Sequence, residues 1–528
     1  MNKTNFNLRK NHRRSSYSSF SLSSLAESKL DKNSKSYSEL NTVNHMERDK
    51  ERKTETPSPK CKKWLLIQIA VAIAASSSFI VNGGVRSWSS PCVPRWLETG
   101  KLAHDDAKFV SGLPPTGALI GALVSGPMLQ FLGRRRTLLI AALPWSASFI
   151  LLGIAPSRSA VFFARITMGF MVGLTSPAAQ LYIAECVEPK IRGILGSLTA
   201  TLMALGILVT YVIGKFTECD VLAWIISSSS VFMLVGMYFC PESPSWLVYR
   251  KRMEEARRSI CRLRGLSDTE DDEITKEIDR INEAVNNQED VSVMKGLEQM
   301  AKSLKPLFLS LILMFFQQFS GINAIIFHAG TIFKASGSSI DNNISAIVVG
   351  AVQFVFTTAA MIIVDKSGRR ILLLLSSVVM FFSLFPLGLF FYLKNNNFNV
   401  GNIQWIPLIS IVGYMIGHSI GYNTIPFLIM SEIFPPSFRN IFSALSSSFN
   451  LFCLFLVVFF YSSMVDCINE EGVFWLYASI CLISIPSVYY LLPETKGKSL
   501  EEVEKLFRNH SEKKTECVNS GFVNDSSV

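Results

Sequence analysis

The sequence predicts an all-α membrane protein, with about twelve transmembrane helices in two six-helix bundles. Only 17% of the 528 residues are charged and 49% are hydrophobic, whereas soluble domains carry about 25% charged residues. The apolar residues fall in runs of about 20, long enough for a helix to cross a bilayer. A duplication divides the chain, because PESPSWL at Pro241–Leu247 resembles PETKGKSL at Pro493–Leu500, and each follows an apolar run. Duplicated membrane halves are typical of alternating-access transporters.

The first 60 residues are expected to form a disordered tail, because Ser, Asn, Lys and Arg dominate and no apolar period is present. The first apolar run begins near Trp64, too late and too long for a secretory signal, so we expect an uncleaved anchor. Lys60, Lys62 and Lys63 precede this run and place the N-terminus in the cytoplasm. An even number of spans returns the C-terminus to that side. We therefore expect a multi-pass protein of the plasma membrane with both termini cytoplasmic.

The expected spans and the polar segments between them define five parts of the chain. The spans lie near 64–85, 108–131, 137–156, 160–184, 194–215, 221–240, 306–333, 344–364, 371–393, 404–430, 441–465 and 473–492. The parts are a tail at 1–60, an N-terminal bundle at 61–240, a cytoplasmic helical insert at 241–304, a C-terminal bundle at 305–492 and a second cytoplasmic tail at 493–528.

Two helices are predicted inside the insert. Ser267–Glu270 reads as a capping box, and an apolar stripe at helical spacing follows it, formed by Ile274, Ile278, Ile281 and Val285. A shorter helix is expected over Met253–Leu263. Both are expected to bury their apolar faces against the cytoplasmic ends of the spans. A flexible linker is the alternative, which the capping box and stripe together disfavour.

Several expected spans contain residues that weaken a helix. Gly83-Gly84 lies late in span one, Ser320-Gly321 in span seven, and Gly417, Gly421 and Pro426 in span ten. A break in the backbone ladder is tolerated in a bilayer only beside protein or a wet cavity. For a single glycine, close helix packing is the simpler interpretation. For span ten we favour a bend beside the solute pathway.

Three amide side chains lie in the middle of span seven, namely Gln317, Gln318 and Asn323. They are costly in an apolar helix unless hydrogen-bonded. An amide offers both donors and an acceptor, so it suits hydroxyl groups, and a sugar or polyol fits this chemistry better than an ion. Interhelical amide bonds are the structural alternative, which three amides together make less favoured.

An ordered set of motifs resembles that of the sugar porters of the major facilitator superfamily, over about residues 64–508. The motifs are GRRR at Gly133, RITMG at Arg165, PAAQLYIAE at Pro177, IRG at Ile191, PESPSWL, QQFSGIN at Gln317, DKSGRR at Asp365, SEIFPPSFR ending at Arg439, and PETKGKSL. The WSSP string at Trp88 is similar to that of insect facilitated trehalose and glucose transporters.

The resemblance implies a set of sugar-contacting residues. They are Gln317, Gln318, Asn323, Gln353, Phe427 and Asn450. Phe427 stands where the family has a tryptophan, so an aromatic face remains but the indole donor is lost. Ser419, Leu451, Ala200 and His328 also depart from the family's usual residues. These departures put the usual substrate in doubt and leave the class of protein intact.

A second set of residues is charged and lies at the expected cytoplasmic ends of the spans. In the second half it comprises Asp365, Arg369, Arg370, Glu432, Arg439 and Glu494, and in the first half Arg134, Arg135, Glu185, Arg192 and Glu242. Ion pairs between bundle ends can hold an inner gate shut and break when the cavity turns inward. Gln130 stands where the family has an acid, so one tie between the bundles is expected to be weaker.

The first span contains no acid between Trp64 and Pro91, and proton-coupled relatives need a titratable group there. We therefore expect facilitated diffusion. Arg86 is interpreted as a snorkelling residue at the membrane interface rather than a gate. Among the ten cysteines, Cys92, Cys219 and Cys467 fall in expected external loops, where a disulfide is an open alternative. Asn343-Ile344-Ser345 is an N-glycosylation sequon in the expected loop between spans seven and eight.

The sequence thus predicts a monomeric uniporter that passes a sugar, hexose or trehalose, through the lipid bilayer by alternating access. No phosphate-binding loop, paired nucleophile or metal-ligand spacing is recognisable, so no enzyme activity, metal or cofactor is expected. The net charge of +10 lies largely in the tails and short turns and does not indicate nucleic-acid binding. Two alternatives stay open: a sugar sensor with little transport, and a facilitator of a polyol or other small neutral solute.

Overall fold

The computed structural model describes residues 59–155, 157–265, 271–289, 304–337, 341–434 and 439–494. The chain divides into two compact units, Met1–Lys63 and Trp64–Val528. Of the first unit, only the first five residues of a helix are described. All that follows concerns the second unit, in whose described residues every regular element is a helix.

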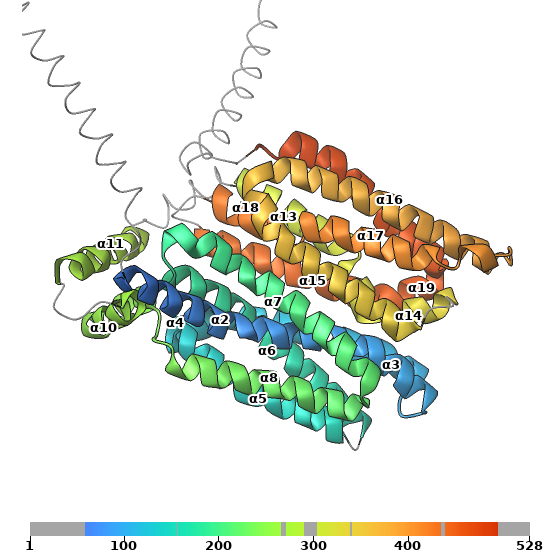
Figure 1. Ribbon diagram of the computed structural model, residues 1–528, viewed down its shortest axis with the longest axis horizontal. Helices are drawn as coiled ribbons and strands as arrows, with labels where there is room; N and C mark the ends of the chain where they lie inside the picture. The colour runs from blue at the N-terminus through green and yellow to red at the C-terminus, as the bar shows by residue number, and fades with distance from the viewer. Residues whose placement is uncertain are drawn as a thin grey trace, which may run out of the picture. The chain divides into compact units, whose positions relative to one another are not determined.

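The helices of the first half precede a short polar segment, and those of the second half follow it (Figure 1). The first-half helices are α2 (Pro59–Ser87), α3 (Ser89–Glu98), α4 (His104–Leu132), α5 (Arg134–Ile154), α6 (Arg158–Cys186), α7 (Pro189–Phe216) and α8 (Cys219–Phe239). The polar segment carries α9 (Pro244–Tyr249), α10 (Met253–Arg264) and α11 (Asp271–Glu289). The second-half helices are α13 (Leu304–Phe319), α14 (Ile322–Ser336), α15 (Asn342–Ser367), α16 (Arg369–Asn395), α17 (Ile406–Ile420), α18 (Ile425–Ile433) and α19 (Arg439–Leu491), with the short 3₁₀ turn η1 (Gly401–Ile403) before α17.

Eleven stretches of the described chain are long and apolar enough to cross a membrane. The last of them, Phe442–Leu491, is 50 residues long, too long for a single crossing. Its helix α19 is interrupted at Asn469, whose backbone has φ 56° and ψ 176°. Asn tolerates positive φ better than most residues. The break lies between the expected spans eleven and twelve, so this stretch is long enough for both of them.

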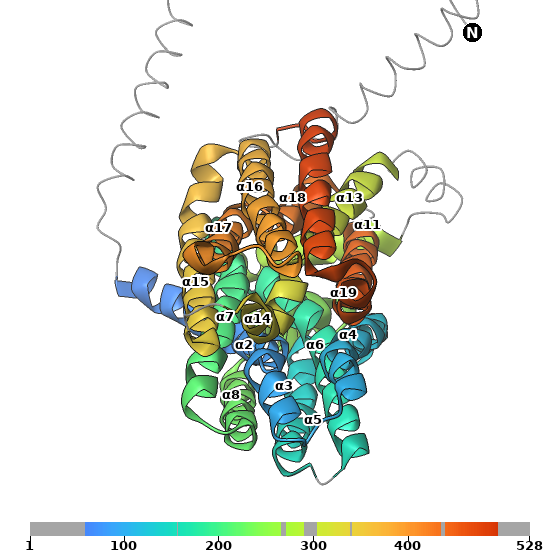
Figure 2. The same ribbon diagram turned by 90° about the vertical axis from the view of Figure 1, so that its right-hand side faces the viewer.

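Each half forms a bundle around a hydrophobic core, and Ile207 and Tyr211 of α7 also pack into the core of the second half. In the first half α6 packs against α4 and α5, and α5 also packs against α8. In the second half α16 packs against α17 and α19, and α13 against α19. The halves meet along α7 and α15, α4 and α19, and α3 and α14. Figure 2 shows α3 and α14 close together, far along the chain from one another.

The bend expected in span ten is present, and span seven is broken as well, where close packing at a single glycine was the simpler interpretation. Span seven is interrupted between α13 and α14 at Gly321, which has φ +95° and lies against the ring of Tyr477. A Cβ on Gly321 would lie 2.5 Å from Tyr477 Cδ2, so only glycine fits here. Span ten is interrupted between Ile420 and Ile425. Gly83 behaves differently, because α2 continues through it and a Cβ there would lie 2.3 Å from Met203 O of α7.

The polar segment folds on itself more than the sequence suggests. The expected helix over Met253–Leu263 is present as α10. The stripe of α11 does not reach the spans, because Ile274 packs with Ile260 and Cys261 of α10. Leu263 of α10 instead joins the core of the first bundle. The capping box at 267–270 and the side chain of Val285 lie outside the described residues.

The three cysteines expected in external loops lie in helices. Cys92 is buried in α3, which extends the first span beyond its expected end, and Cys219 is buried as the first residue of α8. Cys467 is exposed in α19. All three are free thiols in this structure.

Candidate functional site: an amide chain between the two halves

The amides of span seven form one continuous hydrogen-bond chain with Asn450. Asn323 Nδ2 donates to Gln318 Oε1 at 2.5 Å, and Gln318 Nε2 donates to Asn450 Oδ1 at 2.9 Å. Asn450 Nδ2 donates to Gln317 Oε1 at 2.7 Å, and Gln317 Nε2 donates to the carbonyl of Tyr422 at 2.7 Å. All four amide side chains are buried. Four of the six predicted sugar contacts therefore lie together, and they are hydrogen-bonded to one another.

The hydrogen-bond chain forms where two breaks in the second half, between α13 and α14 and between α17 and α18, lie beside α19, which carries Asn450. Gln317 and Gln318 end the regular part of α13, and Asn323 begins α14 just after Gly321. The Tyr422 carbonyl is free to accept because α17 has ended at Ile420. A hydroxyl group can both donate and accept, so it can replace any of these bonds.

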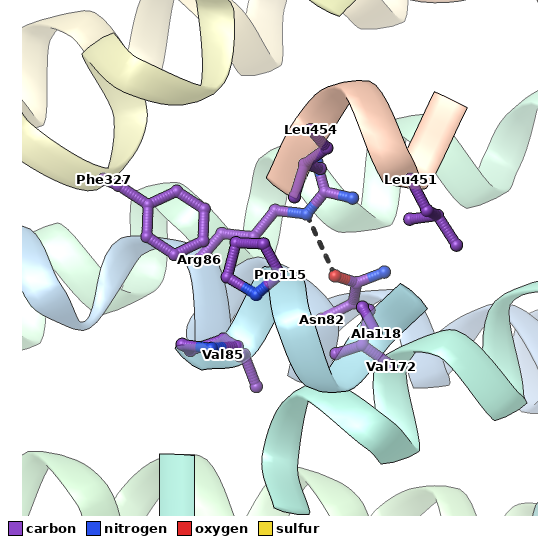
Figure 3. Close-up of a pocket in the computed structure, with 10 residues that line it drawn as sticks. Asn82, Val85, Arg86, Pro115, Ala118, Val172, Phe327, Leu451 and Leu454 are labelled. Carbon is purple, nitrogen blue, oxygen red and sulfur yellow. Dashed lines mark hydrogen bonds between the residues drawn. The ribbon is translucent and has the colours of Figure 1, made fainter. Parts of the chain in front are cut away.

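Arg86 extends the amide chain into the first half. Its Nη1 donates to Asn323 Oδ1 at 3.0 Å, and its Nε donates to Asn82 Oδ1 at 3.1 Å. Figure 3 shows the guanidinium among Pro115, Phe327 and Leu454, pointing into the space between the halves. The interpretation of Arg86 as a snorkelling interface residue is therefore wrong. Its long side chain turns inward, where the amide oxygens of Asn82 and Asn323 are its partners.

A small pocket surrounds Arg86 and is built from both halves. The first half contributes Asn82, Val85, Pro114, Pro115, Ala118 and Val172, and the second half contributes Phe327, Leu451 and Leu454. None of these lining residues carries a negative charge. Leu451, where the family resemblance places a tryptophan, thus lines the same pocket as Arg86 with an aliphatic side chain.

The two remaining predicted sugar contacts have no recorded bond to the amide chain. Gln353 of α15 is buried, and its Oε1 has no partner among the described residues. Phe427, near the start of α18, is partly buried. Nearby, Asn423 Nδ2 donates to Thr357 Oγ1 at 3.1 Å, one helical turn after Gln353 on α15. Gln353 therefore carries a buried acceptor that a bound hydroxyl could satisfy.

The halves are joined by several bonds at one end of the molecule, which we call the α3–α14 end. Gly330 N donates to Ser90 Oγ at 2.9 Å, and a Cβ on Gly330 would lie 2.3 Å from the carbonyl of Ser90. Lys334 Nζ pairs with Glu98 Oε1 at 2.5 Å. This end is therefore closed by direct contact between the halves.

The charged residues at the opposite end, which carries α10, form two matching networks. Arg134 pairs with Glu185 at 2.8 Å in the first half, and Arg369 pairs with Glu432 at 3.1 Å in the second. Glu242 accepts the backbone N–H groups of Arg134 and Arg135. Glu494 likewise accepts those of Arg369 and Arg370. Each carboxylate thus caps a helix that begins just after a glycine.

These recorded pairs lie within one half, whereas ties between the bundle ends were expected for the gate. Arg192 likewise donates to the carbonyl of Val187 in its own half. The side chains of Asp365 and Arg439 lie outside the described residues. The role of the charged set in gating therefore stays a prediction. At Gln130, where the family has an acid, the side chain donates to Tyr249 Oη at 2.7 Å.

Arg165 holds the irregular junction between α2 and α3. Its side chain is fully buried, and it donates to the carbonyls of Val110 and Val85 at 2.9 and 3.2 Å and to Ser89 Oγ at 2.6 Å. Its guanidinium also lies 5.2 Å from the ring centroid of Trp88. The Arg of the RITMG motif thus satisfies a carbonyl near the end of α2, next to Arg86 in the sequence, and ties this end to α4.

Comparison with known proteins decides the family. The family described as "Sugar (and other) transporter" matches residues 62–507. This chain belongs to the sugar transporter family. A facilitated trehalose transporter Tret1 of Polypedilum vanderplanki is 36% identical over 446 residues, 84% of this chain and 88% of the relative. The Tret1 of Culex quinquefasciatus is 35% identical over 85% of this chain and 87% of its own length. Other relatives are longer, and this sugar transporter spans 55% of the Aedes aegypti Tret1.

Solved structures confirm the fold of this sugar transporter. The major facilitator superfamily proton:xylose symporter XylE, bound to 6-bromo-6-deoxy-D-glucose, superposes with a TM-score of 0.69 at 23% identity, covering 83% of this chain and 99% of XylE. A partially occluded inward-open form of XylE from E. coli gives 0.68 at 22% identity, covering 82% and 99%. The family resemblance stated from the motifs and the predicted fold class are both confirmed.

Proposed function

We propose that this sugar transporter is a uniporter that carries a hexose or trehalose down its gradient by alternating access. The observation that carries the proposal is the chain of hydrogen bonds among Gln317, Asn450, Gln318 and Asn323 in the second half. Arg86 joins this chain to the first half. Its members offer donors and acceptors in a buried setting, and they bond to groups that a sugar hydroxyl can replace. Similarity to the facilitated trehalose transporters supports the choice of solute.

The transport cycle follows from contacts that join the two halves. In this conformation Ser90, Glu98 and Arg86 of the first half bond to the second half. Opening at the α3–α14 end must break these bonds, and a rocking motion about the site would expose it at either end. With α10 in the cytoplasm, the conformation described is closed to the outside.

Passage without ion coupling is supported by the charges near the site. The residues lining the Arg86 pocket include no carboxylate, and a guanidinium keeps its proton at neutral pH. A proton carrier in the pathway needs a group that titrates. We also propose that the protein lies in the plasma membrane, has both termini in the cytoplasm and acts as a monomer. The six sugar contacts, the charged gate residues and the five-part domain division are proposed as assigned above.

The proposal is tested by uptake of radiolabelled glucose and trehalose into oocytes that express the protein at their surface. Saturable uptake of either sugar, with equal rates of entry and exit at equal gradients, is the expected result. A sugar sensor is the second candidate, because the amides already satisfy one another and Phe427 and Leu451 replace tryptophans. Saturable sugar binding to the purified protein without uptake would favour the sensor, and uptake of polyols alone would change the solute class.

A further inference from the structure

A second pocket, distinct from the sugar site, lies at the α10 end of the first half. It has a volume of about 360 Å³ and is formed by the start of α5, the segment from Pro241 to Leu247, and α10. Ser259 of α10 donates to the carbonyl of Glu242 at 2.6 Å, which fixes α10 against this segment. The pocket is therefore built by elements that are bonded together.

The lining of this pocket carries an excess of positive charge. Five arginines and two glutamates line it. Glu255 pairs with Arg252, and Glu242 is engaged with the backbone N–H groups at the start of α5. Both carboxylates thus already have partners, and the lining keeps a net positive charge.

Three of the arginines present unengaged guanidinium groups to the pocket. Within the described chain, the side chains of Arg136, Arg258 and Arg262 take part in no recorded hydrogen bond or ion pair, and all three are exposed. Arg258 and Arg262 lie one turn apart on α10, where two like charges destabilise a helix. Arg136 approaches from a different helix, α5. Like charges that converge from separate elements on one cavity indicate an anionic ligand.

We propose that this pocket binds a phosphate group carried by an acidic phospholipid headgroup. Arginine forks match phosphate oxygens in geometry and charge. The membrane spans adjoining the pocket begin at Arg134 and end at Phe239, so its mouth lies at the level where a span leaves the hydrocarbon. Tyr238 and Phe239 next to it are 67% and 65% exposed, as aromatic residues at a membrane interface commonly are.

The general bias of lysine and arginine toward cytoplasmic loops accounts for positive charge at this end, but not for its arrangement. That bias requires no cavity, and α11 also carries two basic residues, Lys276 and Arg280, which are exposed and do not line the pocket. This difference supplies a matched control. A soluble phosphate compound, such as an inositol polyphosphate or ATP, offers the same chemistry as the headgroup and has to be distinguished from it.

The test measures binding of a water-soluble, short-chain phosphatidylinositol bisphosphate to the full-length protein in detergent, by fluorescence anisotropy at fixed ionic strength. The Arg258→Gln/Arg262→Gln double variant is expected to bind about thirty-fold more weakly, the combined effect of two arginines at an anionic surface. The Lys276→Gln/Arg280→Gln variant removes the same charge outside the pocket and is expected to bind as the wild type does. The single variants Arg258→Gln and Arg262→Gln serve if the double variant does not fold.

The competing outcomes separate clearly. Displacement of the probe by inositol hexakisphosphate or ATP at equal or lower concentration would overturn the lipid source. Equal binding by the wild type and both double variants would overturn the site itself, because general charge attraction would then explain all binding. Loss of binding in the α11 variant as large as in the α10 variant would overturn it as well.

Discussion

Replacing Arg86 by methionine tests the link between the two halves. The variant keeps an unbranched side chain but loses the bond from Nη1 to Asn323 Oδ1, which is 3.0 Å long and joins the first half to the second. The other bond, to Asn82, lies within α2 and persists when the halves separate, so it does not alter the balance between conformations. A hydrogen bond to a charged group contributes about 1.5–3 kcal/mol. We therefore expect Arg86→Met to favour opening at the α3–α14 end by about 10-fold to 150-fold.

The assay follows the labelling rate of a thiol introduced by Phe327→Cys, at a buried position that lines the pocket. A membrane-impermeant maleimide is applied from outside, with the exposed Cys467 replaced by serine. Arg95→Met is the matched control, because Arg95 donates to Thr217 O at 2.7 Å within the first half. Labelling is expected to accelerate with Arg86→Met and to stay unchanged with Arg95→Met.

Two results would refute the reasoning about Arg86. Unchanged labelling in Arg86→Met, at equal surface expression, would show that its bond to Asn323 does not hold this end closed. Equal acceleration in Arg95→Met would show that loss of any positive charge near this end loosens it, whichever residues that charge contacts.

Three further predictions concern the site, its energetics and its surface. Gln318→Ala removes the acceptor of Asn323 Nδ2 and the donor to Asn450 Oδ1, so it is expected to weaken sugar binding by about 1–3 kcal/mol. Ser310→Ala is its control, because that buried hydroxyl of α13 has no partner among the described residues; normal uptake affinity in Gln318→Ala would remove the amide chain from the sugar site. Uptake is expected to be unaffected by a protonophore, and a sugar-evoked proton current would contradict uniport. We expect Asn343 to carry no glycan, because the sequon lies in the first turn of α15 with Ser345 buried and its hydroxyl donating to Asp341 O at 3.2 Å; a glycosidase-sensitive shift lost in Asn343→Gln would show otherwise.

The features that could be predicted from the sequence are those set by local chemistry. Apolar length predicted the membrane-spanning runs, and two glycines with a proline predicted the bend in span ten. The break at Gly321 was not expected, because a single glycine is explained by close packing alone. The grouping of Gln317, Gln318 and Asn323 followed from the cost of burying amides in an apolar helix. The sequence could not tell whether these amides bind a solute or one another, because their partner Asn450 is 127 residues beyond Asn323 along the chain.

The features that were missed depend on how separate elements face each other. Arg86 looked like an interface residue because its inward partner, Asn323, belongs to the other half. The stripe of α11 was assigned to the spans, although α10 offered the nearer apolar surface at Ile260. The signal for an inward Arg86 was that it follows Gly83-Gly84 closely in the sequence. Small residues let α2 pack closely on α7, which places this part of α2 near the centre of the molecule.

The hydrogen-bond chain that starts at Arg86 has a polarity. A guanidinium only donates, and each successive amide then donates in the same direction until the Tyr422 carbonyl ends the series. If one amide group were rotated by 180°, its NH₂ group would face another donor and its oxygen would face another acceptor. A solute entering this series must accept on the side of Arg86 and donate on the side of Tyr422. A hydroxyl does both at once, whereas an ether oxygen or a deoxy carbon at the same place would leave an amide unpaired, so the site can distinguish a sugar from its deoxy analogue without any charge on the solute.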